Sequence, residues 1–343
     1  MLRLAAWGLA ALGLALAGCG GDDDDEPAPP IPETRLLEAL ETIGGAESFT
    51  GTGYGWIDVH ALAAEGERAD ELAWAGRALG PGGEDLVRAH EGFRALGAPL
   101  ADATRLVSLS GSYLFGARVD GIDSSTAERA LVAAGARAEP AGEWIDLDRG
   151  PPSSRALGTP LESLEAMVAR TAVGPDALVL ARMDEVRADL RGEGTPSSEA
   201  PAARAAAACL GAEVDAVRIV PNNFTHLPNV GPDVMAFGVE RVAGEPTWEV
   251  LCAIDDSAAE IDDAEAGMRA AFTPGEVDAV TGERISALVD ETVIDRLELE
   301  GLHVVRARLR LAPTNGPGFL FGAFVRGSLV TYFGLQPPLA DAE

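Results

Sequence analysis

The chain opens with an apolar run that ends at a cysteine. Residues 4–18 carry no charged side chain, and Arg3 is the only charge before them. A run of about 15 apolar residues is typical of the core of an export signal, whereas a helix that spans a bilayer needs roughly 20. The pattern therefore predicts a cleaved signal peptide over residues 1–18.

Beyond residue 33 the apolar positions follow helical and extended spacings in turn. Apolar residues between Leu36 and Ile43 recur at helical spacing, with Thr34 as N-cap and Gly44 as stop, which predicts a helix. Residues 49–61 alternate and predict a strand. Further helices are predicted over residues 84–96, 126–134 (capped by Ser124 or Ser125) and 264–272, and further strands within residues 105–119, 143–147, 234–242, 247–254, 298–311 and 319–333. Residues 177–181 are too short and too apolar to assign to a helix or a strand.

Two stretches repeat one order of elements. A strand, an acidic turn and a helix occupy residues 116–135, and the same order returns over residues 247–272. Short turns at residues 243–246, near 300–301 and at 326–328 predict hairpins and therefore antiparallel pairing. We predict an α+β fold of antiparallel sheets with helices packed on one face, arranged in two similar lobes, and the repeated order suggests a duplicated module.

Two segments of low apolar content mark the predicted boundaries. Residues 19–33 combine acidic residues with prolines, and such a segment predicts an extended stalk. Residues 191–201 are rich in Gly, Pro, Ser and Glu and predict a linker. The N-terminal lobe then covers residues 34–190 and the C-terminal lobe residues 202–338.

Composition narrows the range of chemistry. The chain holds 26 basic and 55 acidic residues, a net charge of −29, and removal of the signal peptide takes away only Arg3 and leaves −30. Such a surface repels phosphates, so a nucleic-acid partner is not expected. All 26 basic residues are arginine. Without lysine, Schiff-base catalysis, a Ser-x-x-Lys nucleophile and a P-loop are excluded.

The end of the apolar run carries a lipidation signal. Leu16-Ala17-Gly18-Cys19 resembles the lipobox of bacterial lipoproteins, in which the cysteine thiol receives a diacylglycerol and the chain is cut just before that cysteine. Two or three acyl chains give stable membrane attachment, whereas one chain does not. The resemblance implies a body anchored through Cys19 on the extracytoplasmic face of the cell membrane. The alternative is an ordinary cleaved signal peptide and a free, soluble protein.

Two further cysteines lie in the body. Cys209 and Cys252 both have apolar neighbours in the sequence, so they can meet in one core. In an oxidising compartment a disulfide between them is expected, which would stabilise the fold by about 4 kcal/mol on the chain-entropy model. Two separately buried free thiols are the alternative.

Acidic residues supply two weak candidates for a site. Asp58 and His60 share one face of a predicted strand and suggest an acid-base or metal pair, but no third ligand is evident. The densest acidic cluster suggests a calcium site, although its residues lack the spacing of an EF-hand. The alternative is a solvated turn followed by an acidic helix N-terminus. The proposed calcium ligands are Asp255, Asp256, Asp262 and Asp263, with Glu260 and Glu265 close in sequence.

A ladder of arginines marks one predicted strand. Arg306, Arg308 and Arg310 lie on one face of that strand, with apolar residues on the other. In so acidic a protein the ladder suggests a site for an anionic ligand. The alternative is pairing with carboxylates across the sheet, for which Asp295 and Glu298 are candidates.

The arrangement as a whole is similar to that of uncharacterised lipoproteins of high-GC Gram-positive bacteria. The segments that carry this resemblance are residues 40–58, 116–135, 208–210 with 251–252, and 298–334. The resemblance provides no activity and no catalytic residues that could be carried over to this chain.

The sequence thus predicts a non-enzymatic, membrane-tethered lipoprotein that binds a protein or small ligand, without a cofactor. The motivating features are the anchor, the stalk and the lack of a convergent catalytic set. The alternative is an envelope hydrolase with an unfamiliar site, located at Asp58 and His60 or within the acidic cluster of residues 255–265.

Overall fold

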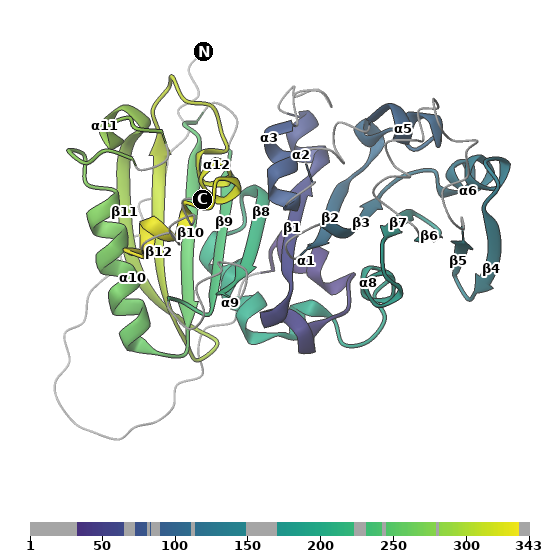
Figure 1. The fold of residues 1–343 in the computed structure, drawn as a ribbon, viewed down its shortest axis with the longest axis horizontal. Coiled ribbons are helices and arrows are strands. Elements are labelled where there is room, and N and C mark those ends of the chain that lie inside the picture. The colour runs from purple at the N-terminus through teal and green to yellow at the C-terminus, as the bar shows by residue number, and fades with distance from the viewer. Residues whose placement is uncertain are drawn as a thin grey trace, which may run out of the picture. The chain divides into compact units, whose positions relative to one another are not determined.

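The computed structural model describes residues 33–64, 73–80, 83, 90–110, 114–148, 170–222, 231–241, 245–278 and 281–335, all within one compact unit. Twelve strands of this part form one sheet, and all their pairs are antiparallel (Figure 1). Their order is β11 (Val289–Leu299), β12 (Leu302–Leu311), β10 (Trp248–Asp255), β9 (Val234–Glu240), β8 (Val214–Pro221), β1 (Gly53–Asp58), β2 (Arg105–Ser110), β3 (Leu114–Asp120), β7 (Ala177–Ala181), β6 (Arg170–Val173), β5 (Trp144–Asp148) and β4 (Arg137–Ala141). The antiparallel sheet and the helices that pack on it confirm the predicted α+β fold class.

The sheet can be divided into two halves that share one order of elements, apart from β4 and β5, which lie between α6 and β6 in the chain and extend the first half beyond β6. In the first half β1, β2 and β3 form a meander, α6 (Ser124–Ala133) follows, and β7 returns beside β3 with β6 next to it. In the second half β8, β9 and β10 form the meander, α10 (Ala258–Ala271) follows, and β12 returns beside β10 with β11 next to it. The halves join through the antiparallel pair β1–β8. Separate lobes are not confirmed, since both halves share one sheet.

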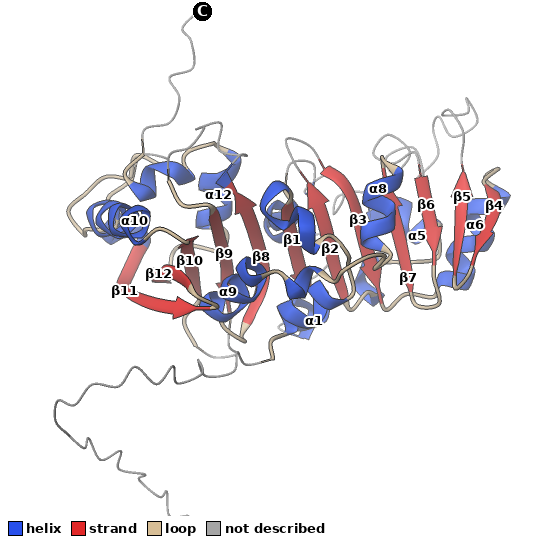
Figure 2. Cartoon of the chain, turned by 90° about the horizontal axis from the view of Figure 1, so that it is seen from below, coloured by secondary structure: helices blue, strands red, loops and turns tan. Residues whose placement is uncertain are grey.

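Helices cover both faces of the sheet, which corrects the predicted one-sided packing (Figure 2). One face packs against α2 (Val59–Ala64), α3 (Ala73–Gly76), α5 (His90–Ala95), α6, α10 and α12 (Phe319–Val325). The other packs against α1 (Arg35–Glu41), α8 (Asp184–Leu190) and α9 (Pro201–Leu210). The remaining short helices are α11 (Ile285–Leu288), η1 (Ala46–Gly51), η2 (Arg77–Leu79), η3 (Leu100–Asp102), η4 (Ser197–Glu199) and η6 (Leu329–Phe333).

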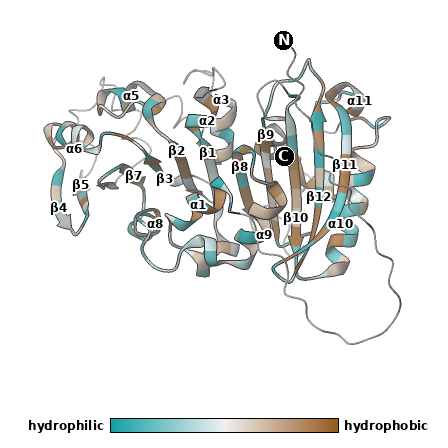
Figure 3. Ribbon diagram, turned by 180° about the vertical axis from the view of Figure 1, so that it is seen from behind, coloured by the Kyte–Doolittle hydropathy of each residue, from teal (hydrophilic) through white to brown (hydrophobic). Residues whose placement is uncertain are grey.

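The central strands explain the two-sided packing. Every residue of β8 is buried, and β9 and β10 are buried along nearly their whole length. Apolar residues, brown in Figure 3, predominate in these strands because side chains on both faces need an apolar partner, and the exceptions include Arg218 of β8 and Glu249 of β10. Only a strand with one solvated face shows clean alternation.

Local signals place several elements where the sequence predicts them. Thr34 caps α1 through its Oγ1, which accepts the Leu37 N–H at 3.1 Å. The turn between β11 and β12 falls at Glu300 and Gly301, whose φ values of 56° and 74° suit a two-residue hairpin loop. The helix α6 starts at Ser124, but its cap is Asp123 and not a serine.

Two predicted extended segments are helical instead. The strand predicted over residues 49–61 is extended only from Gly53 to Asp58: η1 ends just before it at Gly51, and the Asp58 carboxylate accepts the Ala61 N–H at 2.7 Å and starts α2. Residues 319–333 form α12 and η6, and the predicted hairpin there is wrong. The Glu249 carboxylate on β10 accepts the first N–H groups of α12, which a helix N-terminus otherwise leaves without acceptors.

The predicted signal peptide, Cys19 and the stalk up to residue 32 lie outside the described residues. Within the described part of the chain, no helix has both the length and the apolarity that a membrane crossing requires.

Candidate functional site

The two body cysteines form a disulfide. Cys209 of α9 and Cys252 of β10 are bonded at 2.05 Å, and both side chains are 0% exposed. The predicted pairing is confirmed, and the alternative of two free thiols is wrong. The bond ties α9 to the face of the sheet that it covers.

The arginine ladder is paired with carboxylates and is not an open anion site. Its ion pairs join Arg306 to Asp295, Arg308 to Glu240 and Arg310 to Glu291, at 2.6, 2.9 and 2.8 Å. The ring of Trp248 lies beside the guanidinium groups of Arg308 and Arg310, 4.8 and 6.0 Å from their carbons. Asp295 is a partner as expected, whereas Glu298 lies 3.9 Å from His303 instead.

The acidic cluster of the sequence divides in the structure. Asp255 and Asp256, at the end of β10, meet Asp233, and carboxylate oxygens of the three lie within 4.8 Å of one another. Asp262 is exposed on α10 and pairs with Arg296 at 2.6 Å. Asp263, also exposed on α10, lines a separate surface pocket. The four predicted calcium ligands therefore do not converge on one point.

Hydrogen bonds within the chain engage Asp255, the buried member of this group. One of its oxygens accepts the N–H of Ser257 at 2.7 Å, in the turn into α10, and the other accepts the N–H of Asp233 at 2.8 Å, directly before β9. Partial burial, together with Asp255, Asp256 and Glu260, raises the pKa of Asp233. Oxygen ligands of this kind suit a hard cation, but calcium takes roughly six to eight of them.

Asp58 and His60 do not form an acid-base pair. The Asp58 carboxylate binds Arg35 at 2.6 Å and also caps α2. His60 lies within α2 with an exposed side chain. The strand geometry that would place both on one face is lost where α2 begins.

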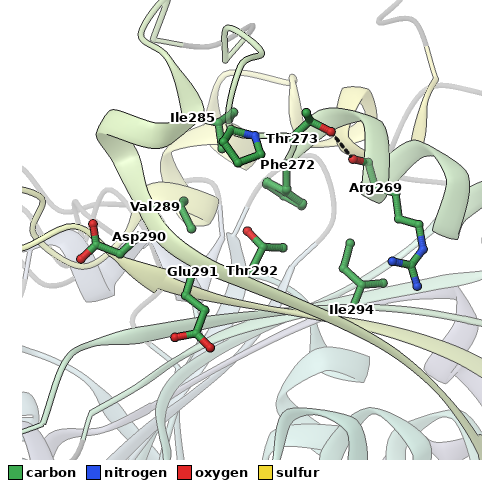
Figure 4. Close-up of a pocket in the computed structure, with 10 residues that line it drawn as sticks. Arg269, Phe272, Thr273, Ile285, Val289, Asp290, Glu291, Thr292 and Ile294 are labelled. Atoms are coloured by element: carbon green, nitrogen blue, oxygen red, sulfur yellow. Dashed lines mark hydrogen bonds between the residues drawn. The ribbon is translucent and has the colours of Figure 1, made fainter.

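A surface pocket of about 320 Å³ lies between the end of α10, α11 and the edge strand β11 (Figure 4). Phe272, Ile285 and Ile294 give it an apolar lining, and Asp290 and Arg269 stand at its margins. None of the residues singled out in the sequence lines this pocket.

A fully buried cation lies where the two halves of the sheet meet. Arg218 of β8 stands opposite Gly55 of β1, and its side chain is 0% exposed. In the part of the chain that the structure describes, its Nε, Nη1 and Nη2 have no hydrogen-bond partner. Buried guanidinium groups normally carry several hydrogen bonds, so this one stands out.

Glycines make room for the guanidinium. A Cβ on Gly53 would lie 2.4 Å from Nη2 of Arg218, and a Cβ on Gly80 would lie 2.7 Å from Nη1. The ring of Phe324, on α12, lies 5.4 Å from the guanidinium carbon. β1, α12 and the end of η2 thus enclose the cation.

Two serines of β2 stand on the same face and differ in their bonding. Ser108 Oγ donates to the Leu79 carbonyl at 2.9 Å. Ser110 Oγ is buried and has no hydrogen-bond partner among the residues described, and a Cβ on Gly80 would lie 2.6 Å from it. We call Arg218 and Ser110, with Gly53 and Gly80, the junction site.

Burial controls the electrostatics of the junction site. It lowers the pKa of Arg218 to about 9, and no carboxylate of the described residues forms an ion pair with it. The group therefore keeps its charge at neutral pH. The signal in the sequence is one arginine inside the apolar run of residues 216–220, opposite glycines of a distant segment.

Comparison with known proteins returns no family model, curated protein or solved structure that matches this chain. The structure itself defines the class: an antiparallel α+β protein that encloses an unpaired cation between two halves of like topology.

Proposed function

We propose that the protein is a lipoprotein held by lipid on Cys19 at the extracytoplasmic face of the cell membrane, where its body binds a ligand or protein partner without catalysis. The lipobox resemblance of residues 16–19 supports the anchor. The observation that carries the proposal is the buried Cys209–Cys252 disulfide, since such bonds persist outside the cytosol and are rare within it.

Two acidic residues that could act as catalytic groups already bind other parts of the chain, and this favours a binding role over hydrolysis. Asp58 is occupied by Arg35 and by the α2 N-terminus. Asp255 is occupied by two backbone N–H groups. A general base needs a free oxygen within reach of its substrate.

We also propose that the two halves derive from one duplicated module. The shared order of meander, helix and returning hairpin supports this. The β1–β8 pair then joins the first strands of the two copies, and sites in proteins commonly lie at such junctions.

Replacement of the lipidated residue tests the anchor. We expect Cys19→Ser to move the protein from the membrane fraction to the soluble fraction, because each buried methylene of an acyl chain contributes about 0.8 kcal/mol to attachment. Cell fractionation with intact-mass measurement of the mature protein would show it. Cys209→Ser, a change far from the anchor in sequence, should leave the protein in the membrane fraction. An unmodified Cys19 in a cytosolic protein that retains residues 1–18 would contradict the proposal.

A further inference from the structure

A charged group without partners is strongly unfavourable inside a protein. Arg218 is held in this state by the fold, because β8 places it on a sheet face that α12 and η2 cover. The described acidic residues do not compensate it: Glu249, the other fully buried charged group on this face, accepts three backbone N–H groups of α12. The described part of the chain therefore leaves this charge without a negative partner.

Two donors of the junction site converge without bonding each other. Nη1 of Arg218 and Oγ of Ser110 both lie on the same side of Gly80, where a Cβ would come within 2.7 and 2.6 Å of them. Neither atom has a hydrogen-bond partner among the described residues. One acceptor beside Gly80, within reach of both donors, would satisfy both, and the neighbouring Ser108 does not compete, since its hydroxyl is bonded to the Leu79 carbonyl.

We propose that Arg218 and Ser110 bind a small monovalent anion, a halide or a short carboxylate, inside the body between the two halves of the sheet. This goes beyond the proposed function and does not depend on the lipid anchor. A failure to bind anions would leave the anchor and the compartment untouched.

Charge and space set the class of anion. The site offers a single positive charge, so a monovalent anion yields a neutral buried pair, whereas sulfate or a phosphate dianion would leave one negative charge uncompensated. The close approach of Gly53 and Gly80 to the guanidinium and the Phe324 ring above it restrict size. Among the described residues, the junction site presents donor groups and no carboxylate ion-paired to Arg218, which favours an anion over a cation.

Thermal unfolding at constant ionic strength provides the test. The mature full-length protein, in a non-ionic detergent with gluconate as the bulky anion, would be titrated with chloride, bromide, formate, acetate or sulfate in place of gluconate. We expect a saturable rise in Tm with halides, with short carboxylates or with both, and no such rise with sulfate. Constant ionic strength removes the screening that any salt gives a protein of net charge −30. The separate halide and carboxylate series identify the anion.

Variants assign the effect to the site. Arg218→Met keeps the length of the side chain without its charge, and should fold and lose the anion-dependent rise in Tm. Ser110→Ala should lower the apparent anion affinity about tenfold, the effect of one lost hydrogen bond of ordinary strength. Ser108→Ala, on the same strand and face, should leave the affinity unchanged. Arg308→Met controls for the loss of an arginine that already has a carboxylate partner.

The possible results either support the anion site or contradict it. Loss of the Tm rise in Arg218→Met but not in Arg308→Met, and an anomalous bromide peak beside Ser110 in crystals, would establish the site. A wild-type Tm that is the same in gluconate and in every tested anion would overturn the proposal, since ordered water would then satisfy the guanidinium. So would a rise that Arg218→Met retains. If Arg218→Met does not fold, equal anion affinities in Ser110→Ala and Ser108→Ala would overturn it.

Discussion

Loss of the Cys209–Cys252 disulfide is expected to lower the free energy of unfolding by about 4 kcal/mol. The two cysteines are 43 residues apart, and restraint of a loop of that length in the unfolded chain gives this value on the chain-entropy model. The folded state adds to the loss, because both sulfurs are fully buried between α9 and the sheet. Urea unfolding of the double variant Cys209→Ala, Cys252→Ala, followed by circular dichroism, measures the change.

Two controls isolate the cross-link from the packing of the side chains. Cys209→Ala alone already removes the bond and should lose most of the stability that the double variant loses. A reductant should lower the urea midpoint of the wild type and leave that of the double variant unchanged. Equal midpoints for the oxidised wild type and the double variant would show that the bond does not stabilise the body.

Signals confined to a few neighbouring residues were sufficient for many elements. The helix after Thr34 forms because cap, apolar stripe and stop lie within one short segment. The hairpin at Glu300 and Gly301 forms because a two-residue turn fixes the pairing of both its strands. Both features depend on contacts that are close in sequence, so the sequence pattern contains the information.

Features that depend on distant partners were missed. The α12 helix takes its N-terminal acceptor from Glu249, on a strand that precedes it by many residues. Asp233 reaches Asp255 because β9 and β10 pair Val234 with Ile254. No local pattern reveals such a register.

The junction site could not be predicted from the sequence, because its local pattern is misleading and its parts are distant in the chain. Arg218 lies in a run that otherwise predicts a buried strand, and an isolated arginine there suggests a strand edge or a surface position. Its true surroundings come from Gly53 of β1, Ser110 of β2 and Gly80 after η2. The antiparallel pairing of β1 with β8 brings these residues close to Arg218. This pairing joins the two halves of the sheet and is not part of either half.

Replacement of Glu249, whose side chain is 0% exposed, is the second change expected to have a large effect on stability. Its oxygens accept the N–H groups of Gly318, Phe319 and Leu320 at 2.6, 2.8 and 2.7 Å. Burial outweighs these three donors and raises the pKa of the carboxyl from 4.5 to about 7. Glu249→Ala, which leaves all three N–H groups without their acceptor, should cost about 3 kcal/mol or more of stability in urea unfolding at neutral pH.

The raised pKa of Glu249 also makes stability depend on pH in a defined direction. Between pH 4.5 and 7 the folded state holds a proton that the unfolded chain has lost, so the free energy of unfolding falls as pH rises through this window. The contribution is about 3 kcal/mol, at 1.36 kcal/mol for each pKa unit. Glu249→Gln does not titrate, so the stability of the wild type relative to this variant should fall by that amount between pH 4.5 and 7.

Urea unfolding of both proteins at intervals of pH measures this difference, in which the titrations of all other groups cancel. Glu265→Gln is the matched control, because Arg296 and Arg269 lower the pKa of Glu265. Its effect has the opposite sign and is confined to lower pH: the wild type should lose stability relative to Glu265→Gln only as pH falls below the ordinary range of a glutamate. A constant difference between wild type and Glu249→Gln from pH 4 to 8 would mean that the Glu249 carboxyl titrates alike in the folded and unfolded chains. The three N–H donors of α12 would then balance the cost of its burial.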